Sequence, residues 1–126
     1  MQLVLLIGLA GFLGTITRYF TGQALYKLFP GSFPVATLLI NLTGCFLIGV
    51  LFGLIEKGSI SSYQTKMILV SGFCGGFTTF SAFSIENLNL LRDGHIGLFA
   101  LNVFLSVFIG LAATWGGLAL IKTFAA

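Results

Sequence analysis

Long apolar stretches, separated by short polar or turn-forming segments, dominate the chain. A helix needs about 20 apolar residues to cross a hydrocarbon core about 30 Å thick. Four stretches meet this length, at about residues 2–25, 35–55, 65–91 and 97–124. The connections between them are short, so the pattern predicts an all-α membrane protein with four transmembrane helices. We expect a single transmembrane domain over residues 1–126.

Composition supports the lipid bilayer as the main solvent. Only 7% of the residues are charged and 57% are hydrophobic, whereas soluble domains carry about 25% charged residues. The net charge of +3 comes from scattered bases, a distribution that does not indicate a nucleic-acid partner. The sequence shows no nucleophile beside a base, no paired carboxylates and no metal-ligand cluster, so we do not expect an enzyme.

The positive charges give little preference for one orientation in the membrane. With four spans, the N-terminus, the second loop and the C-terminus share one side. The bases divide almost evenly between the two sides, as Lys57, Lys66 and Lys122 against Lys27, Arg92 and a snorkelling Arg18. Because such residues normally decide which side faces the cytoplasm, the near-tie favours dual topology and antiparallel pairing of two copies. A single, weakly biased orientation stays open.

Glycines recur at spacings typical of closely packed membrane helices. They are Gly8, Gly11 and Gly14, the pair Gly49 and Gly53, and the pair Gly72 and Gly76. The pattern predicts close helix association without identifying the partner. Since four short helices can scarcely enclose a pathway on their own, we expect a homodimer.

The middle of the third stretch is rich in poor helix formers. Gly75 and Gly76 are followed at once by Thr78 and Thr79, and this combination favours an opened backbone. Broken membrane helices are tolerated where protein or a cavity satisfies the exposed carbonyls, and they often mark ion sites. The alternative is a continuous helix in which the glycines permit close packing.

Aromatic and hydroxyl side chains follow this segment. Phe77, Phe80 and Phe83 recur every three residues, with Ser81 and Ser84 beside them, and we expect the rings to lie along one face of the helix after the break. Aromatic ring edges carry partial positive charge and hydroxyls donate hydrogen bonds, so this lining suits a small anion. The alternative is core packing, with each hydroxyl bonded to its own i−4 carbonyl.

Polar residues also align on the second and fourth stretches. Thr37 and Asn41 share a face of the second, and Asn102, Ser106 and Thr114 align at multiples of four on the fourth. Each set suits either an ion pathway or hydrogen bonds between helices.

Arg18 and Glu86 are charges inside apolar stretches, where an ionisable residue is a functional candidate. Arg18 would concentrate anions at a pore mouth. The role of Glu86 stays open, and it would also be the carboxylate that a proton-coupled exporter of cationic drugs requires. A third hypothesis is a non-transporting assembly subunit.

Residues 75–84, Gly-Gly-Phe-Thr-Thr-Phe-Ser-Ala-Phe-Ser, resemble the GG-x-TTFS-x-F pattern of the Fluc family of fluoride channels, also called CrcB. Gly11-x-x-Gly14 before Arg18, Asn41 and Glu86 reinforce the resemblance, which covers essentially the whole chain. Ala82 and Asn102 depart from residues frequent in the family, which bears on conduction rate or selectivity.

The resemblance implies an antiparallel homodimer with two pores that releases fluoride passively across the cell inner membrane and reduces its toxicity. Phe80 and Phe83 would contact fluoride through their ring edges, and Asn41 would donate a hydrogen bond to it. The polar track would comprise Ser81, Ser84 and Thr114, and Arg18 would lie near the vestibule. A structural Na⁺ at the dimer centre would be bound by the backbone carbonyls of Gly75 and Thr78. A pore-entrance role for Glu86 is a further hypothesis.

Overall fold

The computed structural model describes residues 1–124, which form helices and short connections. Four of the helical segments are long and apolar enough to span a membrane, as the hydrophobic pattern predicts. The first span is α1 (Gln2–Leu28) and the second is α2 (Val35–Glu56). The third comprises α3 (Tyr63–Lys66), the π-helical η1 (Met67–Cys74), α4 (Gly75–Phe77) and α5 (Phe80–Arg92). The fourth comprises α6 (Ile96–Phe104), the π-helical η2 (Leu105–Ile109) and α7 (Gly110–Phe124).

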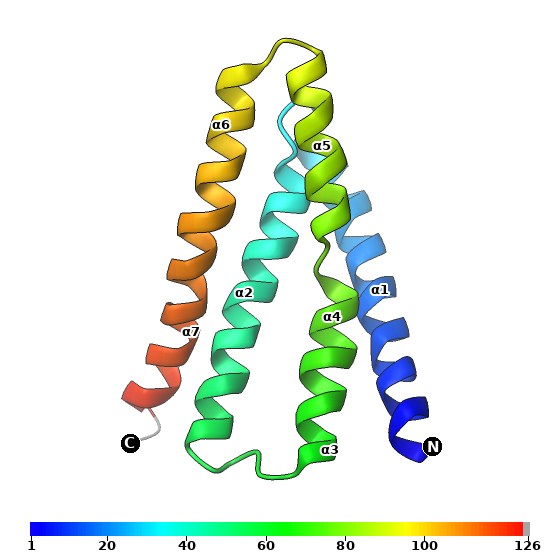
Figure 1. The fold of residues 1–126 in the computed structure, drawn as a ribbon, viewed down its shortest axis with the longest axis vertical. Coiled ribbons are helices and arrows are strands. Elements are labelled where there is room, and N and C mark those ends of the chain that lie inside the picture. The colour runs from blue at the N-terminus through cyan, green and yellow to red at the C-terminus, as the bar shows by residue number, and fades with distance from the viewer. Residues whose placement is uncertain (125–126) are drawn as a thin grey trace.

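The spans alternate in direction, so chain ends and loops fall into two groups (Figure 1). The N-terminus, the 57–62 loop and the end of α7 lie at one end of the bundle. The 29–34 turn and the 93–95 turn lie at the other. This is the distribution that four antiparallel spans predict.

Two of the chain reversals follow helices that end in a left-handed glycine. Gly58 has φ 87° and Gly94 has φ 80°, conformations that glycine adopts without the steric penalty of a Cβ. Gly58 N–H donates to Ile55 O and Ser59 N–H donates to Leu54 O, and the same pair of bonds forms around Gly94. These bonds satisfy the last carbonyls of α2 and α5, which allows short connections.

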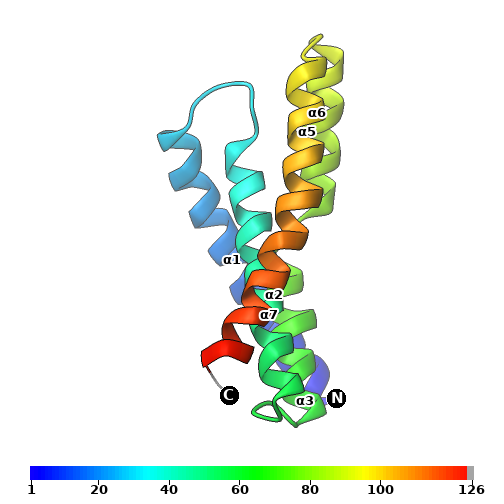
Figure 2. The same cartoon turned by 90° about the vertical axis from the view of Figure 1, so that its left-hand side faces the viewer.

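The third span changes its neighbour part-way along. Its first half packs on α1, through η1 and α4, whereas α5 packs on α6. The second span packs along α7. Viewed from the side, α5 and α6 run together at the upper end, apart from α1 (Figure 2). The change of neighbour occurs where the third helix is interrupted.

Glycines bring two of these helix pairs into close contact. A Cβ on Gly14 would overlap the backbone of Phe73, and one on Gly49 would overlap the carbonyl of Thr114. Gly72, Gly76, Gly53 and Gly117 are similarly crowded, whereas nothing lies within 4 Å of the Gly8 position. The predicted close packing is confirmed, and the partners of these glycines lie within the same chain.

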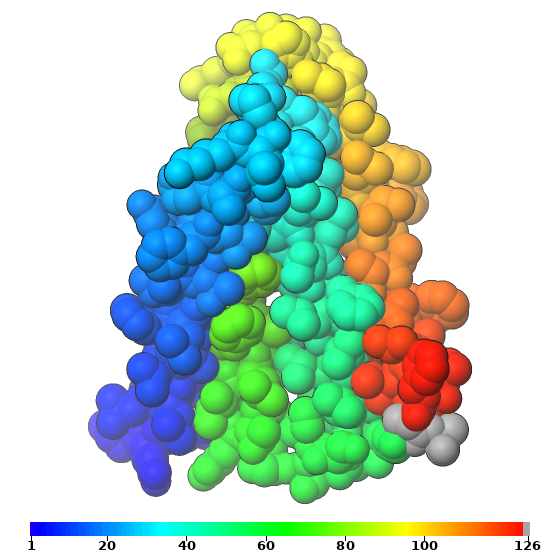
Figure 3. All heavy atoms as spheres, turned by 180° about the vertical axis from the view of Figure 1, so that it is seen from behind, coloured from blue at the N-terminus to red at the C-terminus, as the bar shows by residue number. Residues whose placement is uncertain are grey.

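Large apolar side chains cover the outside of the bundle. Phe12, Leu111 and Trp115 are among the exposed ones, and Figure 3 shows a face of the bundle along which α1 runs from the lower left up to the 29–34 turn near the top. A surface of this kind is stable in hydrocarbon and not in water. The chain is a multi-pass membrane protein.

Candidate functional site

The third helix is broken at Thr78 and Thr79. Thr78 has φ −87° and ψ 158°, and Thr79 has φ −149° and ψ 116°, so both are extended. The Thr79 hydroxyl then caps α5 by accepting a hydrogen bond from the Ala82 N–H at 3.2 Å. Of the two interpretations of this segment, the broken helix is confirmed.

Asn41 on α2 bridges the break. Its Nδ2 donates to the Thr79 carbonyl oxygen at 2.9 Å, and its Oδ1 accepts from the Thr79 N–H at 2.9 Å. One side chain therefore satisfies both backbone groups of Thr79. Because an amide nitrogen carries two hydrogens, a second Asn41 N–H remains, and Asn41 also lines a cavity with Phe80.

Two carbonyl oxygens at the break lose their helical donors. The Thr79 N–H, which in a continuous helix would bond the Gly75 carbonyl, donates to Asn41 instead. The Ala82 N–H, which would bond the Thr78 carbonyl, donates to the Thr79 hydroxyl. Helix-end carbonyls of this kind are available to other partners.

Phe80 and Phe83 form an aromatic pair on α5. Their ring centroids lie 5.5 Å apart at an interplanar angle of 38°. Phe80 is 78% exposed although it lies in the middle of the third span. A neutral aromatic ring is thus exposed beside the break.

Phe77 does not continue this aromatic face, so the prediction of a three-ring stripe was wrong at this residue. Phe77 lies before the break in α4, is only 4% exposed, and stacks on Phe73 with centroids 6.0 Å apart. The extended backbone at Thr78 and Thr79 interrupts the helical repeat, so a spacing of three residues no longer places the rings on one face.

The hydroxyls near the break differ in what they bond. Ser81 lies 3.3 Å from the Thr79 hydroxyl, and Ser84 lines a cavity with Phe80 and Phe83. By contrast, Thr114 donates to its own i−4 carbonyl, Gly110 O, at 3.1 Å. Bonding to the same helix therefore explains Thr114, whereas Ser81 and Ser84 face other groups.

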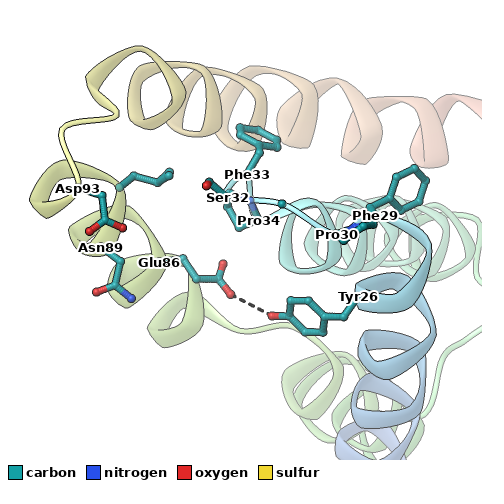
Figure 4. Close-up of a pocket in the computed structure, with 11 residues that line it drawn as sticks. Tyr26, Phe29, Pro30, Ser32, Phe33, Pro34, Glu86, Asn89 and Asp93 are labelled. Atoms are coloured by element: carbon teal, nitrogen blue, oxygen red, sulfur yellow. Dashed lines mark hydrogen bonds between the residues drawn. The ribbon is translucent and has the colours of Figure 1, made fainter.

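A half-buried carboxylate lies at the end of the bundle nearest the 29–34 turn (Figure 4). Glu86 Oε1 accepts from the Thr37 hydroxyl at 2.6 Å and from the Tyr26 hydroxyl at 3.4 Å. Its Oε2 is buried and has no hydrogen-bond partner among residues 1–124. Glu86 lines a cavity of about 230 Å³ together with the 29–34 turn, Asn89 and Asp93. A pore-entrance role for Glu86 stays a prediction.

Arg18 shares a cavity with a residue of the break. It lines a cavity of about 170 Å³ with Thr37, Thr79 and Ala82. The residues that line this cavity come from the first, second and third spans. They include Thr79, whose hydroxyl caps the start of α5.

Like Arg18 and Thr37, Thr114 lines neither of the cavities described above that contain Phe80. It lies on α7, where its carbonyl faces Gly49. Its role in a polar track stays a prediction.

Tyr26 and Asn87 belong to these clusters but were not predicted. Asn87 is 6% exposed and accepts a hydrogen bond from Asn102 Nδ2 at 2.9 Å. Its position four residues after Phe83 on the same helix was a usable signal. Tyr26, close to the end of α1, gave no signal that distinguishes it from an ordinary interfacial tyrosine.

The sequence model of the family described as "CrcB-like protein, Camphor Resistance (CrcB)" matches residues 5–118. This chain belongs to the CrcB family. The resemblance seen in residues 75–84 is therefore confirmed over most of the chain.

Several CrcB proteins named "Fluoride-specific ion channel FluC" are similar to this chain over nearly their whole length. The protein of Flavobacterium psychrophilum is 46% identical over 122 residues, which covers 97% of this chain and 98% of the relative. The protein of Rhizobium etli is 38% identical, covering 94% of each chain. The protein of Campylobacter jejuni is 42% identical, covering 94% of this chain and 97% of the relative. These CrcB relatives are named for ion conduction rather than for drug export or assembly.

Proposed function

We propose that this chain forms a passive, fluoride-selective channel that releases fluoride across the cytoplasmic (inner) membrane and so reduces its toxicity. The observation that carries the proposal is the Phe80–Phe83 pair, with Phe80 78% exposed in mid-span beside a helix break bridged by Asn41. The names of the CrcB relatives support the same function.

The lining explains how a strongly hydrated anion exchanges its water for protein contacts. Ring edges of Phe80 and Phe83 offer partial positive charge, and Ser81, Ser84 and the second N–H of Asn41 offer neutral donors. Many weak contacts replace hydration without binding the ion so strongly that it cannot leave. Since fluoride is smaller than chloride, a pathway narrow enough to discriminate by size would favour fluoride.

The approach to this lining is charged. Arg18 lies in one cavity with Thr37 and Thr79 and raises the local concentration of anions. Glu86 accepts a hydrogen bond from the Thr37 hydroxyl, and we assign it to the entrance. An anion that passes Thr37 would thus exchange a charged vestibule for a neutral interior.

We further propose that two copies pair antiparallel and that the dimer carries two pores. The crowded glycines of the chain already contact helices of the same chain, whereas Phe80 remains exposed. An exposed ring beside hydroxyl and amide donors is better explained by a pathway shared with a second copy than by contact with lipid. The near-tie of basic residues on the two sides supports insertion in both directions. Thr114 reaches the aromatic pair only if a second copy brings it there.

The carbonyl oxygens of Gly75 and Thr78 fit a structural Na⁺. Their helical donors are engaged elsewhere, Gly75 is exposed on the surface of the chain, and hard cations prefer oxygen ligands. When bound, Na⁺ would supply a positive charge that stabilises the unpartnered carbonyls of the break. A centre between two copies would double the number of such oxygens.

The test is ion efflux from liposomes that contain only the purified protein. We expect rapid fluoride efflux that follows the membrane potential and a much slower chloride efflux. Equal fluoride and chloride rates would refute selectivity. Vesicles that stay sealed to fluoride but exchange a cationic drug for protons would favour the proton-coupled exporter, and vesicles that stay sealed to both would favour an assembly subunit.

A further inference from the structure

A buried amide pair joins the two helices on either side of the 93–95 turn. Asn102 on α6 is 1% exposed and Asn87 on α5 is 6% exposed. Asn102 Nδ2 donates to Asn87 Oδ1 at 2.9 Å. Burying an amide costs free energy unless it is hydrogen-bonded. This bond satisfies the Asn87 oxygen and one N–H of Asn102, whereas the Asn102 oxygen is buried without a partner among residues 1–124.

The direction of this hydrogen bond decides whether the oxygen or the nitrogen of the Asn87 amide is occupied. Its oxygen is occupied by Asn102, whereas no hydrogen bond from its nitrogen is found within residues 1–124. Asn87 is therefore held with its acceptor satisfied and its N–H donors available. Such a group is suited to an anion or to the oxygen of water.

Asn87 lines the same cavity as the aromatic pair Phe80 and Phe83. This cavity has a volume of about 300 Å³, and Ser84 also lines it. The spacing of these residues places them on one face of α5. The remaining lining residues are apolar, and they are Leu88, Leu91, Phe99 and Val103. Ser84 and Asn87 are thus the polar side chains of an otherwise apolar lining, which is typical of a binding site.

We propose that the Asn87 amide is a further anion-binding group of the pathway, one turn beyond Phe83, and that Asn102 is its positioning residue. The ligand class is a small, hydrated halide, and the proposal rests on the proposed function. The geometry gives the anion an aromatic edge from Phe83, a hydroxyl from Ser84 and an N–H from Asn87 along one helix face. The amide of Asn102 holds the donor end of Asn87 in place.

Two substitutions test the donor directly, in liposomes that contain the full-length protein. Asn87→Leu removes the amide and keeps a side chain of similar size, and Asn87→Asp keeps the oxygen that Asn102 bonds while replacing the donors by an acceptor. We expect Asn87→Leu to raise the fluoride concentration for half-maximal efflux about tenfold, the change given by one hydrogen bond to a charged group. Asn87→Asp should reduce efflux further, because it also adds a negative charge.

Asn102→Leu separates positioning from binding, since it leaves the Asn87 donors present but unfixed. We expect a smaller rise in the half-saturating concentration than for Asn87→Leu. Gln64→Leu, near the start of the third span and remote from the cavity, is the control for loss of an amide and should behave as wild type. Thermal unfolding in detergent identifies variants that fail to fold, and Asn87→Leu decides the matter if Asn87→Asp is one of them.

A purely structural pair would give a different result. In that case Asn87→Leu and Asn102→Leu would lower the unfolding temperature alike, and the half-saturating concentration per folded protein would equal the wild-type value. That result would overturn this inference alone, because the wild type would still conduct. A wild type that passes no fluoride would overturn the proposed function and this inference with it.

Discussion

Asn41 and Thr79 exchange two hydrogen bonds across the second and third spans, each 2.9 Å long. The Asn41 side chain bonds the N–H and the carbonyl of Thr79, as the backbone of a neighbouring β-strand would. This pairing allows an extended segment inside a membrane helix. Unsatisfied backbone groups in hydrocarbon cost several kcal/mol. The break in the third helix therefore depends on a residue of the second helix.

Removing both bonds of Asn41 should destabilise the protein, whereas removing one should separate folding from conduction. Asn41→Leu leaves two backbone groups of Thr79 unsatisfied, at a cost of about 1–3 kcal/mol each. Asn41→Asp keeps the acceptor for the Thr79 N–H, so we expect an assembled protein without fluoride efflux. Unfolding in detergent and efflux from liposomes measure the two effects. Thr43→Val, which removes a hydroxyl bonded to its own helix, is the control, and wild-type efflux in Asn41→Asp would contradict the pathway role.

Phe80→Ile should abolish fluoride efflux while the protein still assembles. The substitution keeps an apolar side chain but removes the aromatic edge, so it affects the ion and not the burial of apolar surface. Phe12→Ile is a matched control, because Phe12 is 60% exposed on the first span and lies far from the break in sequence. Efflux is measured in liposomes, and assembly by size-exclusion chromatography. Undiminished efflux in Phe80→Ile would sink the assignment of this ring to the pathway.

Neighbouring glycines of the fourth span should respond in opposite ways to alanine. A Cβ at Gly117 would overlap the backbone of Phe46 and Val50, whereas nothing lies within 4 Å of a Cβ at Gly116. We expect Gly117→Ala to lower the free energy of unfolding by about 1–3 kcal/mol. Gly116→Ala should leave it unchanged or raise it by up to about 1 kcal/mol through helix propensity. Denaturation in detergent measures both, and equal effects would contradict the packing of α2 on α7.

Exchanging Na⁺ for a large organic cation should lower the unfolding temperature of the assembled protein. The carbonyls of Gly75 and Thr78 have lost their helical donors, so a bound cation contributes to stability in proportion to the logarithm of its concentration. We expect the unfolding temperature to rise with Na⁺ concentration and to respond less to an organic cation at the same ionic strength. Identical curves for the two cations would argue against a sodium site.

A cysteine in the 57–62 loop should be reachable from both sides of the membrane. Ser59→Cys places a thiol in this exposed loop, and membrane-impermeant reagents added outside intact cells should label about half of the protein if both orientations are populated equally. The wild type is the control, since Cys45 and Cys74 lie within spans. Complete labelling or complete protection would show a single orientation and contradict dual topology.

The hydrophobic pattern was sufficient for the four spans, and the glycine spacing predicted close helix packing without naming which helices pair. Gly14, Gly49 and Gly72 lie at crowded contacts, because small residues in membrane helices allow two backbones to approach closely. The pattern also identified the segment where the third helix breaks. It left that break as one of two alternatives, since whether a backbone opens depends on a partner such as Asn41 being within reach.

A single sequence did not predict which residues of different helices contact each other. The partners of Asn41 and Asn87 depend on how far each helix is rotated and shifted along its neighbour, and no spacing within one helix records this. Phe77 was assigned to the wrong face because the extended residues after it alter the helical phase. Local periodicity therefore predicts elements well and fails at the irregular backbone where the candidate site lies.

The bond between Asn102 and Asn87 has a consequence for how the protein enters the membrane. The two residues are separated by 15 positions and lie on either side of a corner closed by Gly94. An isolated amide that crosses lipid alone carries the full desolvation penalty, and pairing with the preceding helix relieves it. We therefore expect the third and fourth spans to enter the membrane together as a helical hairpin, which then packs against the first and second spans.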